Sequence, residues 1–129
     1  MDSVIKPFEK ITFNKMVLLL DFDDYDDCCG FPEYIPRRKV LWKSDTVMIK
    51  SLKSSTWHTC GEDICTISSK LLLFNNNHLV KTYEILLGSN MVGIQSQETG
   101  WVKAIDTEEI ISIFSNFSSY SHLLFCIDI

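Results

Sequence analysis

The chain of 129 residues is 46% hydrophobic and 22% charged, which excludes disorder over its whole length and fits a single domain over residues 1–129. Its 12 basic and 17 acidic residues give a net charge of −5. A domain that binds nucleic acid is normally basic, so the charge balance argues against that function for the domain as a whole.

The first clear element is an apolar run over residues 15–20, which predicts a buried strand. A short helix or strand is expected before it. Residues 46–52 and 64–68 have the β-branched composition that is typical of strands. The first half of the chain therefore predicts strands separated by loops.

The middle of the chain predicts a hairpin. Residues 71–74 and 79–87 are strand-like, and between them lie residues that tolerate left-handed backbone angles: Asn75, Asn76, Asn77 and His78. Turns at 88–90 and 97–100 then lead into strands over 91–95 and 101–105. Short strands joined by short loops indicate an antiparallel meander of about five or six strands.

A helix is predicted to follow the meander. Asp106 is a helix-capping residue, and Glu109 comes three positions later, as in a capping box. Apolar residues then recur at spacings of three, four and seven: Ile110, Ile113, Phe114 and Phe117. Residues 118–121 end this helix, and residues 122–127 fit either a strand or a second short helix. The fold class expected is α+β, an antiparallel sheet packed by one or two helices.

The start of the chain lacks the basic and apolar stretches of a secretory signal. The longest early apolar run covers residues 16–20, far short of the roughly 20 residues that span a bilayer. The five cysteines are an odd number, which fits free thiols in a reducing compartment. We therefore expect a cytoplasmic protein with no membrane partner.

Metal and cofactor sites are not favoured by the spacing of the ligand-type residues. His58, Cys60 and Cys65 lie close together, but a second paired knuckle is missing, and the adjacent Cys28 and Cys29 suit one tetrahedral ion poorly. We expect no cofactor. An irregular calcium site in the acidic run at residues 21–27 stays open as an alternative.

One enzymatic alternative rests on two aspartates. Asp21 and Asp23 follow an apolar strand and resemble the nucleophile strand of haloacid-dehalogenase-type phosphatases, in which two aspartates on one side of a strand act as nucleophile and acid/base. That family needs Thr or Val where Tyr25 stands, and it needs a parallel sheet. A small metal-dependent hydrolase is therefore kept only as an alternative.

The most unusual feature of the sequence is an acidic run interleaved with aromatic residues. The candidate partner-binding residues in it are Asp21, Asp23, Asp24, Tyr25, Asp26, Asp27, Phe31, Glu33 and Tyr34. Crowded carboxylates repel one another, but they steer a positively charged protein, and aromatic side chains fill pockets at the centre of an interface. We expect this run to bind a basic protein. The alternative is a solvated acidic loop.

The middle of the chain has the opposite charge. Residues 37–81 contain eight basic and three acidic residues, whereas the segments on either side each carry a net charge of −5. Basic residues from Arg37, Arg38 and Lys39 to Lys53 are interleaved with Trp42 and Trp57, a pattern that suits single-stranded nucleic acid. The flanking acidic segments oppose this alternative, so we expect no nucleic-acid partner.

In size, acidity, lack of a catalytic motif and α+β pattern, the chain resembles the immunity proteins of bacterial toxin systems, such as contact-dependent growth inhibition and nuclease bacteriocins. The resemblance implies a cytosolic protein, not an enzyme, that binds one cognate toxin domain. That domain is often a nuclease, and its basic cleft would be blocked. On this reading the acidic side chains stand in for substrate phosphates, and Tyr25, Phe31 and Tyr34 are packing anchors.

Overall fold

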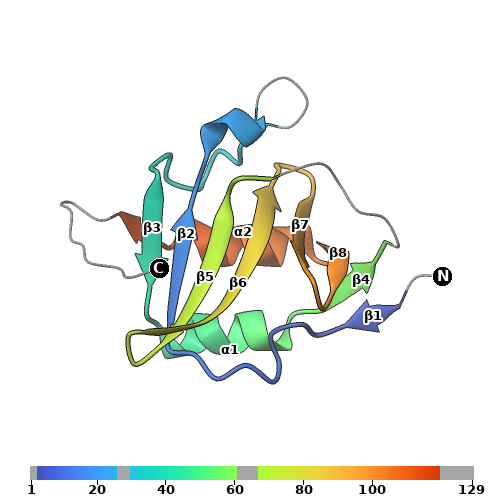
Figure 1. Ribbon diagram of the computed structural model, residues 1–129. Coiled ribbons are helices and arrows are strands. Elements are labelled where there is room, and N and C mark those ends of the chain that lie inside the picture. The colour runs from blue at the N-terminus through green and yellow to red at the C-terminus, as the bar shows by residue number, and fades with distance from the viewer. Residues whose placement is uncertain (1–2, 26–29, 61–66, 120–129) are drawn as a thin grey trace.

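A single antiparallel sheet organises the chain in the computed structural model, which describes residues 3–25, 30–60 and 67–119 (Figure 1). Within these ranges the sheet has nine strands in the order β1-β4-β8-β7-β6-β5-β2-β3-β9. The α+β class is confirmed, and the expected five or six strands are too few. The additional strands are mostly short ones at the two edges of the sheet.

The strands are β1 (Val4–Ile5), β2 (Lys15–Leu19), β3 (Val40–Lys43), β4 (Trp57–Thr59), β5 (Lys70–Asn75), β6 (His78–Leu87), β7 (Val92–Ser96), β8 (Gly100–Ala104) and β9 (Ser118–Ser119). The helices are α1 (Thr46–Ser54) and α2 (Thr107–Ser115), and a 3-10 turn, η1, covers Phe22–Tyr25. None of the helices in the described part of the chain is long and apolar enough to cross a membrane.

The predicted meander forms the centre of the sheet. The hairpin of β5 and β6 turns at Asn76 and Asn77, which have φ angles of 52° and 69°. Asparagine tolerates this left-handed region better than most residues, so the prediction was specific. β7 and β8 follow as expected, and the buried strand near residue 15 is β2.

The strand predicted over residues 46–52 is wrong, because this segment is α1. The Asp45 side chain caps the helix by accepting a hydrogen bond from the backbone N–H of Met48 at 3.0 Å. Ile49 and Leu52 then face the core at helical spacing. A cap and a buried helical face outweigh the weak strand propensity of a few β-branched residues.

Two other predictions fall wholly or partly outside the described residues. The strand expected at 64–68 has its first three residues there, and Ile67 and Ser68 lie in no strand. Residues 122–127 also lie outside the described ranges.

The predicted helix after the meander is confirmed, but it ends at Ser115, before Phe117 and the expected end at residues 118–121. The Asp106 side chain accepts a hydrogen bond from the backbone N–H of Glu109 at 3.0 Å, which satisfies one of the free amides at the start of α2. Ile110 and Phe114 are buried on the side that faces the sheet, and Phe117 packs directly after the helix ends.

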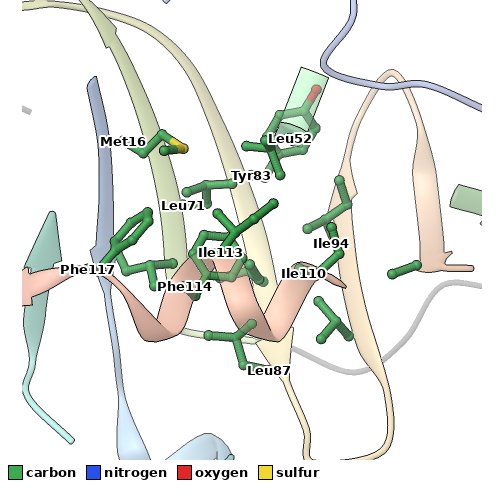
Figure 2. Packing of buried hydrophobic residues seen from close by; sticks show 14 of the residues in the cluster. Met16, Leu52, Leu71, Tyr83, Leu87, Ile94, Ile110, Ile113, Phe114 and Phe117 are labelled. Carbon is green, nitrogen blue, oxygen red and sulfur yellow. The ribbon is translucent and has the colours of Figure 1, made fainter. Parts of the chain in front are cut away.

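The core lies between one face of the sheet and both helices (Figure 2). The members labelled in the figure come from β2, α1, β5, β6, β7, α2 and the segment after α2: Met16, Leu52, Leu71, Tyr83, Leu87, Ile94, Ile110, Ile113, Phe114 and Phe117. A smaller cluster of Val17, Leu72 and Phe74 belongs to the opposite face, because alternate strand residues point to opposite sides.

Candidate protein-binding site

The acidic run begins with a helical turn rather than a continued strand. η1 follows β2 after Leu20 and Asp21, and the Asp21 side chain accepts a hydrogen bond from the backbone N–H of Asp23 at 3.0 Å. The backbone N–H of Asp21 donates in turn to the Ser69 hydroxyl at 2.9 Å. Asp21 and Asp23 are therefore not alternate residues on one side of a strand, which removes the geometric basis of the phosphatase resemblance.

Asp24 has a structural role. Its carboxylate accepts hydrogen bonds from the backbone N–H groups of Ser68 at 3.2 Å and Ser69 at 2.8 Å. It thereby fastens η1 to the segment that enters β5. Asp23 is exposed to solvent, and Asp26 and Asp27 lie outside the described residues. The predicted acidic cluster thus divides between residues that hold the fold and residues that face solvent.

Two of the three expected aromatic anchors pack within the protein. Tyr25 is 7% exposed, and its hydroxyl accepts a hydrogen bond from the backbone N–H of Leu87 at 2.8 Å. Phe31 is half-buried and makes edge contacts with Phe22 and Tyr25, with ring centroids 5.4 and 5.2 Å apart. The guanidinium of Arg37 lies over the Phe22 ring at 4.5 Å. Tyr25 in particular is a core residue, contrary to the expectation of a surface anchor.

The loop after this aromatic cluster is held at both ends. The carbonyl of Gly30 accepts a hydrogen bond from the backbone N–H of Ser89 at 3.1 Å, which ties the loop to the turn between β6 and β7. Pro32 and Ile35 are buried, and the N–H of Ile35 donates to the carbonyl of Pro32 at 3.4 Å. The loop is therefore fixed in position by its own residues.

Glu33 and Tyr34 project from the tip of that loop. Both are exposed, and the Tyr34 side chain is 77% exposed, the highest value among the large hydrophobic residues described. Single exposed apolar residues are common on protein surfaces. An aromatic ring that is this exposed, and that lies beside a carboxylate and a hollow, is typical of residues that anchor a protein interface.

The hollow is a groove of about 500 Å³ between this loop and α2. We call it the acidic groove, and its lining residues are Pro32, Glu33, Tyr34, Ser89, Glu108, Ile111, Ser112 and Ser115. Glu33 stands on the loop side and Glu108 on the helix side. None of these lining residues is basic, so the groove carries two negative charges without a cation in its walls.

The helix side of the groove is formed by a line of α2 residues distinct from its buried face. Glu108, Ile111, Ser112 and Ser115 recur at spacings of three, four and seven, which places them on one side of the helix. Sequence reasoning missed these residues, as it missed Ser89. The helical spacing of these residues is visible in the sequence, but only the tertiary structure brings them opposite Glu33 and Tyr34.

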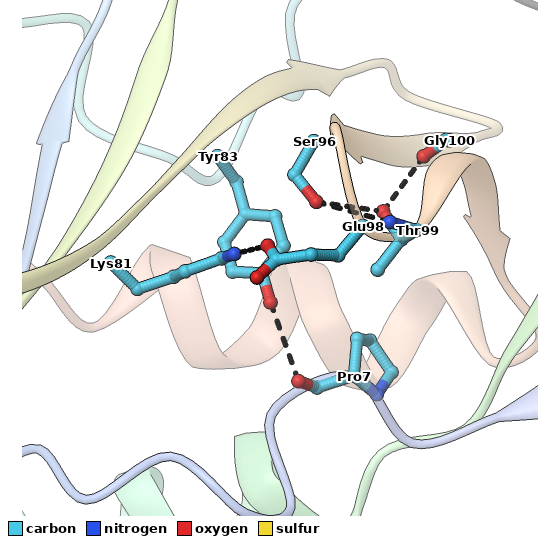
Figure 3. A network of polar contacts seen from close by, with 7 residues as sticks. All are labelled: Pro7, Lys81, Tyr83, Ser96, Glu98, Thr99 and Gly100. Atoms are coloured by element: carbon cyan, nitrogen blue, oxygen red, sulfur yellow. Dashed lines mark hydrogen bonds and ion pairs between the residues drawn. The ribbon is translucent and has the colours of Figure 1, made fainter.

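A larger hollow of about 650 Å³ lies beside β6 and the turn between β7 and β8. Its lining contains two lysines, Lys70 and Lys81, and two glutamates, Glu84 and Glu98. Lys81 forms an ion pair with Glu98 (Figure 3). Behind the ion pair, the Tyr83 hydroxyl donates to the carbonyl of Pro7 at 3.3 Å, and burial raises the pKa of Tyr83 to about 12. This hollow has no unbalanced charge to offer a ligand.

The residues considered for zinc do not come together in the described ranges. Those ranges contain no group of three or more His, Cys, Asp or Glu side chains placed to hold a metal ion. The Cys60 thiol donates to the carbonyl of His58 at 3.8 Å. Cys28, Cys29 and Cys65 lie outside the described residues.

The aromatic residues of the basic stretch are not arranged as a stacking platform. Trp57 is fully buried, and its indole N–H donates to the Ser55 hydroxyl at 2.8 Å. Trp42 is partly buried and packs against the smaller cluster on the sheet. Arg37 lies over the rings of Phe22 and Phe31.

Comparisons with family models, with curated proteins and with solved structures found no match to this chain.

Proposed function

We propose that the protein is a non-enzymatic inhibitor of the immunity type, which acts in the cytoplasm by binding a positively charged toxin domain and occluding it. The observation that carries the proposal is the acidic groove. Two carboxylates from separate elements line it, no basic side chain balances them, and the exposed Tyr34 ring stands at its rim. Charge of one sign around a hollow attracts a partner of opposite sign and orients it.

Further negative charge lies near the helix wall of the groove. Asp106 and Glu109 are exposed at the start of α2, in the same turn as Glu108. Charges on a protein surface act together over about 10 Å at moderate ionic strength. They therefore add to the attraction of a basic partner, although they do not line the groove.

The structure changes which residues we assign to binding. Asp21, Asp24 and Tyr25 hold the fold, and Phe31 packs in the aromatic cluster. We assign binding to Glu33, Tyr34 and Glu108. The assignments of Asp23, Asp26 and Asp27 stay predictions from the sequence.

No observation favours either alternative function. A hydrolase at Asp21 and Asp23 loses its geometric basis, because the two residues belong to a turn. A single-stranded nucleic-acid module needs rings on which bases stack, and Trp57 is buried.

The direct test uses the product of the gene beside this one, because toxin and immunity genes lie next to each other in the systems that the chain resembles. That polypeptide is purified and titrated with this protein by isothermal titration calorimetry, and its toxic activity is assayed with and without this protein. We expect one-to-one binding and loss of activity at equimolar protein. Absence of binding, or binding without inhibition, would overturn the proposal.

A further inference from the structure

We infer that the acidic groove receives an arginine side chain of the partner, with its guanidinium between Glu33 and Glu108 and stacked on Tyr34. This inference rests on the proposed function, since it names the partner's chemistry at the same site. It is drawn from three properties of the groove: its uncompensated charge, its exposed ring and its apolar floor.

The first property is the uncompensated negative charge of the groove. Within the described ranges the ion pair that forms is Lys81 with Glu98, and neither Glu33 nor Glu108 has a basic partner. Glu33 and Glu108 both line this hollow, so a cation placed in it is attracted by both carboxylates. The groove therefore selects a positively charged group over a neutral or anionic one.

The shape of the cation is selected by the groove's other groups. A guanidinium is flat, carries five N–H donors and stacks on aromatic rings, whereas an ammonium is a compact and strongly hydrated charge. Tyr34 offers a free ring face, and the chain already places a guanidinium on a ring where Arg37 lies over Phe22 at 4.5 Å. Both features favour arginine over lysine.

The floor of the groove suits the rest of an arginine side chain. Ile111, which is partly exposed, provides apolar surface for its aliphatic stem, and the hydroxyls of Ser112 and Ser115 add acceptors for N–H groups not taken by the carboxylates. A volume of about 500 Å³ lies in the range of sites that hold small ligands, so it accommodates the side chain and part of its backbone.

The test is a nuclear magnetic resonance titration of the isotope-labelled full chain with three blocked tripeptides, Ac-Gly-X-Gly-NH₂, in which X is arginine, lysine or citrulline. Citrulline keeps the shape of arginine but has no charge. We expect the arginine peptide to shift the amide signals of Glu33, Tyr34, Ile111 and Ser112. It should bind about two- to fivefold more tightly than the lysine peptide, the gain expected from stacking at an exposed ring. The citrulline peptide should cause no shifts.

Two variants test whether the ring of Tyr34 causes the preference for arginine and whether the two carboxylates cause the binding. Tyr34→Ala removes the ring from an exposed position and should make the arginine and lysine peptides equal. Glu33→Gln combined with Glu108→Gln should abolish the binding of both. Equal binding of the two peptides to the unaltered protein, or shifts located away from the groove, would overturn the inference.

Failure of the inference is distinguishable from failure of the proposed function. Equal binding of both cationic peptides that depends on Glu33 and Glu108 would overturn the inference of an arginine and leave the proposed function standing. Binding and inhibition of the neighbouring gene's product are measured without these peptides. Absence of that binding or inhibition would overturn the proposed function itself.

Discussion

Asp24 fastens the turn after β2 to the start of β5, through its carboxylate and the backbone N–H of Ser69 at 2.8 Å. A second hydrogen bond, from the N–H of Ser68 at 3.2 Å, strengthens the link. Hydrogen bonds to a charged acceptor contribute more than neutral ones. The negative charge at this position therefore stabilises the fold, while its neighbour Asp23 faces solvent.

The change Asp24→Ala should lower the free energy of unfolding by about 1.5–3 kcal/mol, because it removes a charged acceptor from the backbone N–H groups of Ser68 and Ser69, of which the second is in a buried residue. Asp23→Ala is the matched control and should stay within about 0.5 kcal/mol of the unaltered protein. Urea unfolding followed by circular dichroism measures both. Equal effects of the two substitutions would show that the carboxylate of Asp24 does not anchor the segment.

Gly93 lies against the indole of Trp101, and a Cβ added there would stand 1.9 Å from the Cη2 atom of that ring. Gly93→Ala should therefore force the indole or the strand to move and cost at least about 1–3 kcal/mol, as other overpacked sites do. Gly30→Ala is the control, because its Cβ would be 3.7 Å from the nearest atom, the Ser89 hydroxyl. Thermal unfolding of both variants provides the comparison, and a stable Gly93→Ala protein would contradict this packing.

The parts of the fold that were predictable have strong local signals. The turn at Asn76 and Asn77 requires left-handed backbone angles, and the cap at Asp106 precedes a regular apolar stripe. α1 was misread because its β-branched residues favour strands, while the signal that decides its structure is the cap at Asp45. Local propensity is weaker than a cap combined with tertiary packing.

The binding site was less predictable because it is assembled from distant segments. Glu33 and Tyr34 were recognised from their acidic and aromatic surroundings, whereas Glu108 gave no such signal. The sequence also could not separate Asp24 and Tyr25, which hold the fold, from residues that face solvent. Asp24 and Tyr25 form hydrogen bonds with Ser69 and Leu87, which lie far along the chain, and no local sequence pattern predicts such partners.

Burial raises the pKa of Tyr83 to about 12 from its ordinary value of 10.0. Between these values the unfolded chain loses the phenolic proton while the folded protein keeps it, so stability is fully retained below pH 10 and falls as the pH rises toward 12. The linkage predicts a loss of up to about 1.4 kcal/mol per pH unit from this group.

Tyr83→Phe removes the ionising group and isolates its contribution from that of other residues. At neutral pH the variant should be less stable by about 1 kcal/mol, because it loses the hydrogen bond to the carbonyl of Pro7. The difference between the two proteins should shrink as the pH rises above 10 and reverse before pH 12, because the loss over two pH units exceeds the initial advantage of about 1 kcal/mol. Denaturant unfolding at a series of pH values measures this, and a constant difference would show that Tyr83 ionises equally easily in both states.

The proposed binding of a basic partner depends most on the two carboxylates of the acidic groove. The decisive measurement is the dissociation constant for the neighbouring gene's product of the double variant Glu33→Lys with Glu108→Lys. The control is Glu9→Lys with Glu98→Lys, which changes the net charge equally at exposed positions outside the groove. We predict that reversal in the groove weakens binding at least about 30-fold, the effect of losing close charge pairs. The control should change binding far less, and equal weakening by both variants would contradict a binding site in the groove.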